Sequence, residues 1–236
     1  MKMVPNSPYS TTSRAEEKVY DKLKRVNIVD PKGEYYVYHS LNLPNHKTKI
    51  MGEIDFLICG PKGIFAIEVK GGGVQCKDGE WHFTNRHGNV ARKREGPFEQ
   101  ARTAMFALKK DIGREFGSHI ANSFSYGYGV IFPDCRWAVE SSEWEAEQIA
   151  DLTSMRNFDR WINDLIAYWR NKPYNDTRPL EKDLMAVQSY LRPAFESAVP
   201  LFVQAEDIQS RIVQLTEDQM RLVDIVSSND KVLCTG

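Results

Sequence analysis

The chain has 236 residues, 42 % of them hydrophobic, and a formal net charge of −1 at pH 7, which is ordinary for a globular protein with a core. No apolar run approaches the roughly 18 residues that a membrane span needs, and the N-terminus lacks the apolar stretch of a secretory signal, so we expect a cytoplasmic protein with no membrane partner. The four cysteines and five histidines show no CxxC, HxxxH or HExxH spacing, so any bound metal is expected on carboxylates rather than in a zinc site.

The N-terminal segment predicts an arm followed by a helix. Residues 1–12 are polar and contain two prolines, and we expect them to form a flexible arm. Ser13 fits a helix N-cap, with Glu16 three residues later completing a capping box and apolar residues continuing at helical spacing. The cap explains Glu16; the alternative is an acid near a functional site. Residues 33–43 are aromatic and β-branched and predict a strand, and a basic loop is expected at 44–50.

A β-hairpin is predicted next, because two apolar runs at 52–59 and 64–70 flank a Gly/Pro turn. The simplest register for a four-residue loop pairs Cys59 with Ile64. Because side chains alternate across a strand, one face of this hairpin is expected to be polar and the other to pack on a core. The apolar face consists of Ile54, Phe56, Ile58, Phe65, Ile67 and Val69.

The polar face of this hairpin carries four charged residues, with Asp55 opposite Glu68 and Glu53 opposite Lys70. Two carboxylates about 5 Å apart repel each other unless a positive charge lies between them. A divalent cation is one such charge, and Lys70 is another. Hard oxygen ligands for Mg²⁺ or Mn²⁺ beside an ammonium group suit a metal-dependent phosphodiesterase. The alternative is a surface hairpin with a Glu53–Lys70 ion pair and solvated acids.

The segment after three consecutive glycines predicts a second hairpin at 74–84, turning at Asp78-Gly79. A basic loop follows at 85–96. Pro97 suits the first turn of a helix that is expected to run to about residue 116, with Gln100 in that first turn.

Charge is distributed unevenly along the chain. Residues 86–114 carry eight Lys and Arg against three acids, and residues 134–164 carry eight acids against three Arg. A basic segment beside a carboxylate site suits a polyanionic substrate, although a solvated helix face explains it almost as well.

The C-terminal half predicts mainly helices. The expected elements are a strand at 126–132 and helices at 158–169, 180–191 and 216–227, followed by a strand at 231–236. The helix at 216 is expected because Thr216-Glu-Asp-Gln219 is a second capping box. The acidic stretch 134–154, with two tryptophans, is not assigned. The tail carries no GxxxxGK[ST] loop, so it cannot bind a nucleotide by itself.

Residues of about 13–133 resemble the nuclease-related domain (NERD), a branch of the restriction-endonuclease-like PD-(D/E)xK fold. The resemblance implies an α/β protein with a restriction-endonuclease-like core at 13–135, in which helices flank a mixed central β-sheet, and a helical C-terminal extension at 136–204. The sequence departs from the family pattern at Ala15, where a glycine is usual. The matching motifs are Ala15-Glu-Glu-Lys-Val19, Gly52-Glu-Ile-Asp55, Gly60-Pro-Lys-Gly63, Ile67-Glu-Val-Lys70, Asp78-Gly-Glu-Trp81 and Pro97-Phe-Glu-Gln100.

The resemblance also implies roles for individual residues. Asp55 and Glu68 would bind Mg²⁺ or Mn²⁺, Lys70 would be the catalytic lysine, Glu16 would be an additional acid and metal ligand, and Gln100 would be a further site residue. The substrate would be DNA, with RNA as the alternative. Its backbone would be held, without sequence readout, by Arg92, Lys93, Arg94 and Arg102.

Residues 205–236 are similar to the start of a UvrD-like superfamily 1 helicase domain, with Gln219 in the place of the adenine-contacting glutamine. This similarity implies a helicase downstream as a partner. Two other classes of function stay open. One is a non-catalytic nucleic-acid-binding or docking module, and the other is a protein-interaction scaffold built on the acidic, tryptophan-bearing 134–170 region. Catalysis is favoured because both carboxylates and the lysine are present together.

Overall fold

A computed structural model describes residues 1–9, 13–28, 30–43, 52–85, 87–194, 201–229, 231 and 233. The chain divides into two compact units, Met1–Pro193 and Ala194–Gly236. The basic loop expected at 44–50 lies outside the described residues, as does the end of the expected arm at 10–12.

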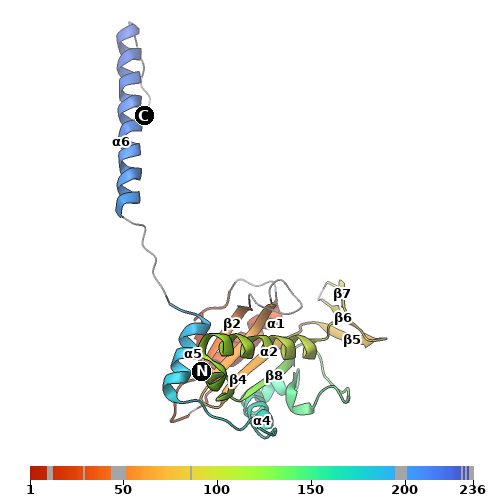
Figure 1. Ribbon diagram of the computed structural model, residues 1–236. Coiled ribbons are helices and arrows are strands. Elements are labelled where there is room, and N and C mark those ends of the chain that lie inside the picture. Colours follow the sequence, from red (N-terminus) through yellow and green to blue (C-terminus); the bar gives the residue numbers. More distant parts are fainter. Residues whose placement is uncertain are drawn as a thin grey trace. The chain divides into compact units, whose positions relative to one another are not determined.

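The first unit is built on a six-stranded mixed sheet (Figure 1). The second, third and fourth strands in spatial order form an antiparallel meander, and each remaining strand runs parallel to its inner neighbour. In spatial order the strands are β1 (Lys2–Val4), β2 (Tyr36–Leu43), β3 (Gly52–Gly60), β4 (Gly63–Val69), β8 (Tyr126–Phe132) and β9 (Ile149–Asp151).

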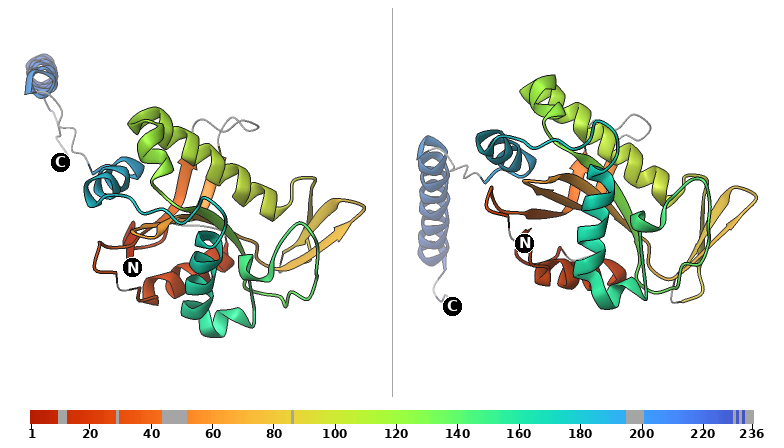
Figure 2. Two further views of the ribbon diagram at one scale, coloured as in Figure 1. Left: turned by 60° about the horizontal axis from the view of Figure 1, so that its bottom comes forward. Right: turned by 90° about the horizontal axis from the view of Figure 1, so that it is seen from below.

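Helices cover both faces of this sheet, as Figure 2 shows. On one face α1 (Arg14–Arg25) and α4 (Phe158–Arg170) pack on the sheet, and on the other α2 (Pro97–Phe116) and α5 (Glu181–Leu191) do so. All seven residues of β4 are buried, as expected for a strand covered on both faces. The remaining short helices are α3 (Ser118–Asn122), η1 (Ala146–Gln148) and η2 (Ser154–Asn157). This arrangement agrees with the expected restriction-endonuclease-like core.

A second, three-stranded antiparallel sheet projects from one end of the first unit (Figure 1). Its strands are β5 (Gly73–Lys77), β6 (Glu80–Thr84) and β7 (Val90–Lys93). The hairpin expected at Asp78-Gly79 is confirmed, and both turn residues have positive φ, 50° and 75°, the left-handed geometry that such two-residue turns need. The expectation of a loop throughout 85–96 is wrong, because β7 pairs with the open edge of β6.

Local sequence patterns predicted most helices and strands correctly. The helix at 97–116 and the strand at 126–132 have the expected bounds, and Ser13 caps α1 by accepting a hydrogen bond from the Glu16 amide. The N-terminal arm differs, since Lys2–Val4 pairs with β2 and buries Met3 in the core. No break in the sheet separates residues 136–193 from the core, because β9 pairs with β8.

The second unit contains α6 (Leu201–Ser228), a single helix of 28 residues. The expected helix start at Thr216 is therefore wrong. Residues 201–215 contain neither Gly nor Pro, so nothing ends the helix before the capping-box sequence. The strand expected at 231–236 falls mostly on residues outside those described. In the described part of the chain, no helix is long and apolar enough to cross a bilayer.

Candidate active site

The central hairpin places two carboxylates and a lysine together where β3 and β4 separate. The expected register is confirmed by the pairing of Cys59 with Ile64, but the expected four-residue loop is wrong, because Gly60 also pairs with Gly63. The ladder ends at the pair of Phe56 with Ile67. At the next position the Asp55 Oδ2 atom accepts a hydrogen bond from the backbone N–H of Val69, with a distance of 2.7 Å. The aspartate thus bonds to the β4 backbone through its side chain, at the point where the strands open.

An irregularity in β2 lies beside the same point. Ser40 has φ +55°, and the pairing of β2 with β3 skips from His39–Phe56 to Leu41–Ile54. Side-chain alternation reverses there. Ile54 packs on the face of the sheet that α2 covers, whereas Phe56 packs on the face that α1 covers. The expectation that Ile54 and Phe56 share one apolar face is therefore wrong.

Lys70 pairs with Glu68 on its own strand. The Lys70 Nζ atom donates a hydrogen bond to Glu68 Oε1, and Glu68 is only 6 % exposed, so its charge needs a partner. The expected opposition of Glu53 and Lys70 is not formed, because Glu53 accepts a hydrogen bond from the Ser40 hydroxyl on β2 instead. The alternative of a Glu53–Lys70 surface ion pair is thereby contradicted.

The electrostatics of this cluster disfavour the ionised form of Asp55. Burial, followed by the charge of Glu68, raises the pKa of Asp55 well above its usual value, and Lys70 and the Val69 N–H only partly offset this. Burial alone would lower the pKa of Lys70, but Glu68, Asp55 and Glu16 raise it on balance. The acids therefore favour the ammonium form of Lys70, while Asp55 is easier to protonate than an exposed aspartate.

Helix α1 reaches this cluster because Gly71 has no side chain. A Cβ atom at Gly71 would lie 2.6 Å from the Ala15 Cβ atom, so the first turn of α1 packs directly on the end of β4. Asp134 joins the same elements by accepting hydrogen bonds from the Gly72 N–H at 2.9 Å and from the Lys18 ammonium at 2.5 Å. Ala15, the departure from the family motif, is accommodated by this glycine.

The same packing brings Glu16 into the field of the site, where its charge raises the pKa of both Asp55 and Lys70. Behind it lies His39, which sequence reasoning missed. This histidine is 1 % exposed, its Nε2 atom is 3.5 Å from Glu16 Oε2, and no hydrogen bond satisfies that nitrogen in the described part of the chain. The only signal in the sequence was a histidine within an aromatic strand. The residue that it faces depends on how β2 pairs with β3, which the local sequence does not show.

In the described part of the chain, no hydrogen bond or ion pair links the other predicted site residues to this cluster. Gln100 is buried in the first turn of α2, but among the described residues its side chain makes no hydrogen bond to the acids or to Lys70. Arg92 and Lys93 lie exposed on β7, and Arg94 directly follows them. Arg102 lies on α2 and pairs with Glu99 one turn away.

The donor set suits a hard divalent cation. Asp55 and Glu68 offer carboxylate oxygens whose mutual repulsion a cation would relieve, and Mg²⁺ is commonly bound through one or two carboxylates with several waters. Across the ranges described, no group of three or more His, Cys, Asp or Glu side chains is placed to hold a metal. The fit is therefore to a two-carboxylate site completed by water and not to an all-protein cage.

The comparison with protein families agrees with this geometry. The family model of the nuclease-related domain, NERD, matches residues 11–133, just over half of the chain. The matched region runs from α1 through β8 and contains every element that builds the cluster. No match was found among curated proteins, and none among solved structures.

Proposed function

Because the chain belongs to the nuclease-related domain family, we propose that the first unit is a Mg²⁺- or Mn²⁺-dependent nuclease that hydrolyses phosphodiester bonds in DNA. One observation carries the proposal. Asp55 and Glu68 lie together where the hairpin opens, with the pKa of Asp55 raised and Lys70 alongside. Burial and the mutual repulsion of the two carboxylates disfavour their charged forms, and a divalent cation between them would relieve both.

In the proposed mechanism the acids hold the metal and Lys70 acts on the water and the phosphate. Asp55 and Glu68 hold the cation, which supplies Lewis-acid stabilisation of the phosphate and a more acidic water. Glu16, whose charge already acts on the site, would bind a second metal or a water on the first. Lys70 donates hydrogen bonds to the attacking water or to a phosphate oxygen and offsets the charge that develops on the phosphate.

The protonation state of Lys70 depends on the acids beside it. While their charge is uncompensated, it raises the pKa of the lysine, so Lys70 stays protonated and acts as a hydrogen-bond donor. A cation held by Asp55 and Glu68 would offset part of their charge, which would make the ammonium form of Lys70 less favourable. Lys70 can then help to deprotonate the attacking water.

The remaining residues are assigned to substrate contacts. Gln100 orients the water or a phosphate, and four basic side chains hold the backbone without reading sequence. Those side chains are Arg92, Lys93, Arg94 and Arg102. The downstream helicase and the cytoplasmic location stay predictions from the sequence.

A non-catalytic nucleic-acid-binding module is the second candidate. The observation that favours it is the direct hydrogen bond between Lys70 and Glu68, which gives the lysine a structural role in the metal-free protein. In that case the acids would have no cation to bind, and Lys70 would serve only to neutralise Glu68.

The test is cleavage of labelled single-stranded, duplex and supercoiled DNA, and of RNA, in Mg²⁺, Mn²⁺ or EDTA. We expect metal-dependent cleavage that Asp55→Ala and Lys70→Ala each reduce by at least about 100-fold. Glu53→Ala is the matched control, since it removes a carboxylate from the same strand that bonds to Ser40 instead. Nucleic-acid binding without cleavage in any metal would favour the module, and cleavage unaffected by Asp55→Ala would reject the assigned site.

A further inference from the structure

We propose that a groove along α1 binds the phosphodiester backbone of the nucleic acid as it leaves the active site. This α1 groove is lined by Lys18, Lys22 and Arg25 of α1 and by Arg156 of η2. The inference rests on the proposed function, because it takes the polymer cut at Asp55 as the ligand. It assigns binding to a different surface from the basic residues of β7.

The groove is continuous with the catalytic end of the sheet. A pocket of about 840 Å³ lies beside Gly71, the residue after Lys70, and Lys18 lines it. Lys18 also lines the next pocket, of about 480 Å³, together with Lys22, Arg25 and Arg156. The last three line a third pocket, of about 570 Å³, at the start of α4. The shared lining residues show that the three pockets adjoin one another along α1.

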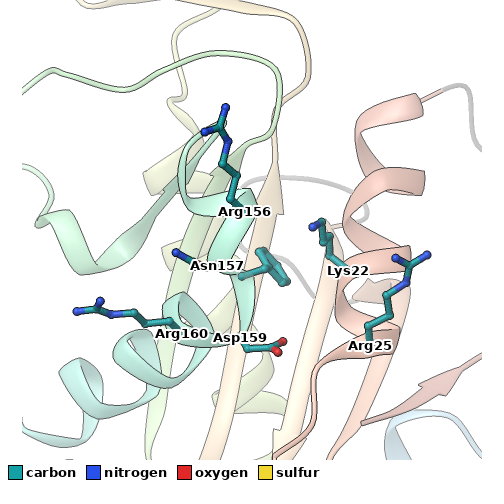
Figure 3. A pocket seen from close by; sticks show the side chains of 7 residues that line it. Lys22, Arg25, Arg156, Asn157, Asp159 and Arg160 are labelled. Atoms are coloured by element: carbon teal, nitrogen blue, oxygen red, sulfur yellow. The ribbon is translucent and has the colours of Figure 1, made fainter.

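The charge of the α1 groove is mainly positive, and of its four basic side chains Lys18 forms an ion pair, with Asp134. Within the part of the chain that is described, no ion pair is formed by Lys22, Arg25 or Arg156. The acids that line the second and third pockets are Asp21 and Asp159. Figure 3 shows Lys22 on the side of α1 that faces η2, with the Arg25 side chain running along α1. Asp159 points toward α1, and Arg160 points away from it.

The spacing of these charges favours a polymer over a small anion. Lys18 and Lys22 are four residues apart, and Arg25 follows three residues later, so α1 presents basic side chains about 4.5–6 Å apart along the groove. A repeating array of this kind fits a chain of phosphates. Lys18 is paired with Asp134, and phosphate would compete with that carboxylate for it. Basic residues in the last turn of α1 also complement the helix dipole, which would account for Lys22 and Arg25. It does not account for Arg156, which comes from another element and lies across the groove.

The start of α4 adds a second attraction for phosphate. Asn157, the N-cap residue, makes no side-chain capping hydrogen bond, and it lines the third pocket with the first residues of the helix. Uncapped N–H groups at a helix N-terminus favour anions. Asp159 lies in this first turn and offsets part of the effect, so the arginine and lysine side chains supply most of the attraction.

The experiment measures binding of labelled single-stranded DNA of about 30 and about 6 nucleotides by fluorescence anisotropy in EDTA, where the proposed nuclease is inactive. The test variant is Lys22→Glu/Arg25→Glu/Arg156→Glu. The matched control is Lys32→Glu/Lys110→Glu/Lys182→Glu, which makes the same change in net charge at exposed positions outside the groove. Because Lys22 is half-buried, the double variant Arg25→Glu/Arg156→Glu is measured beside them, and circular dichroism checks that each variant is folded.

We expect the test variants to bind the longer DNA about tenfold or more weakly than the control. The slope of the logarithm of the binding constant against the logarithm of salt concentration should fall in magnitude by about 0.7 for each lost phosphate contact. The difference in affinity between test and control variants should be smaller for the short DNA. Equal weakening in test and control variants would overturn the α1 groove, because net charge alone would then explain the loss. So would binding of anionic lipid vesicles in preference to DNA.

The two proposals can fail separately. Wild-type protein that binds DNA through the α1 groove but does not cut it in any metal would reject the nuclease and keep the groove. Wild-type protein that cuts DNA, with a KM for long DNA that the groove variants do not change, would reject the groove and keep the nuclease.

Discussion

Asp55→Asn should stabilise the metal-free protein, because the asparagine copies the uncharged form of the side chain. Its amide oxygen can still accept the hydrogen bond from Val69, which measures 2.7 Å in the wild type. Burial and the charge of Glu68 raise the pKa of Asp55, so the charged form is less favourable in the folded than in the unfolded chain. Removing the charge therefore raises the free energy of unfolding, by about 1.4 kcal/mol for each pH unit between the folded and unfolded pKa values.

The pH dependence follows from the direction of that shift. A carboxyl group with a raised folded pKa loses stability as the pH increases from its unfolded pKa, about 3.9, to its folded pKa. The variant lacks this loss, so it should match the wild type near pH 4 and exceed it at pH 8. For a unit of this size each kcal/mol corresponds to about 2–4 °C in Tm, and we expect a gain of about 3 °C or more in EDTA at pH 8.

In the presence of metal, the wild type should melt at a higher temperature than Asp55→Asn, the reverse of the order in EDTA. Ligand at 100 times its Kd stabilises a protein by about 2.7 kcal/mol, and only the wild type retains both carboxylates, Asp55 and Glu68. Differential scanning fluorimetry in EDTA and in a Mn²⁺ titration measures both effects. An Asp55→Asn variant that melts below the wild type in EDTA at pH 8 would mean that the carboxylate is structural. An equal response of both proteins to Mn²⁺ would refute Asp55 as a ligand.

Two further changes test the surroundings of the site, and a third tests the end of β9. Gly71→Ala should cost about 1–3 kcal/mol and reduce cleavage, because its Cβ would lie 2.6 Å from that of Ala15; Ala15→Gly in the same chain should restore part of both in a double-mutant cycle. His39→Phe removes the nitrogen that faces Glu16 and should lower Mn²⁺ affinity about tenfold with little change in Tm, as measured by titration calorimetry and melting. Asp151→Asn should lower the free energy of unfolding, measured in urea at pH 7, by about 1 kcal/mol. Hydrogen bonds lower the pKa of Asp151 despite its partial burial, so the difference in stability between variant and wild type should narrow below about pH 4.

The local sequence determined the elements whose signals lie within a few residues. The Gly/Pro turn and the apolar runs beside it were enough to predict the pairing of Cys59 with Ile64. Pro97 and the apolar stripe after it were enough to predict α2. The acids, the lysine and the family motifs are likewise local. These features are read from a turn geometry or a repeat of 2 or 3.6 residues, so no knowledge of the rest of the fold is needed.

Only the tertiary structure decided how these elements form a site. The contact of α1 with the end of β4 depends on Gly71 and Ala15, which are more than fifty residues apart in the sequence. The reversal at Ile54 depends on the pairing of β3 with β2, and the position of His39 depends on the same pairing. The α1 groove likewise needs η2, which lies more than a hundred residues after α1. Such contacts arise when whole elements pack, and a local pattern carries no information about which partner an element will meet.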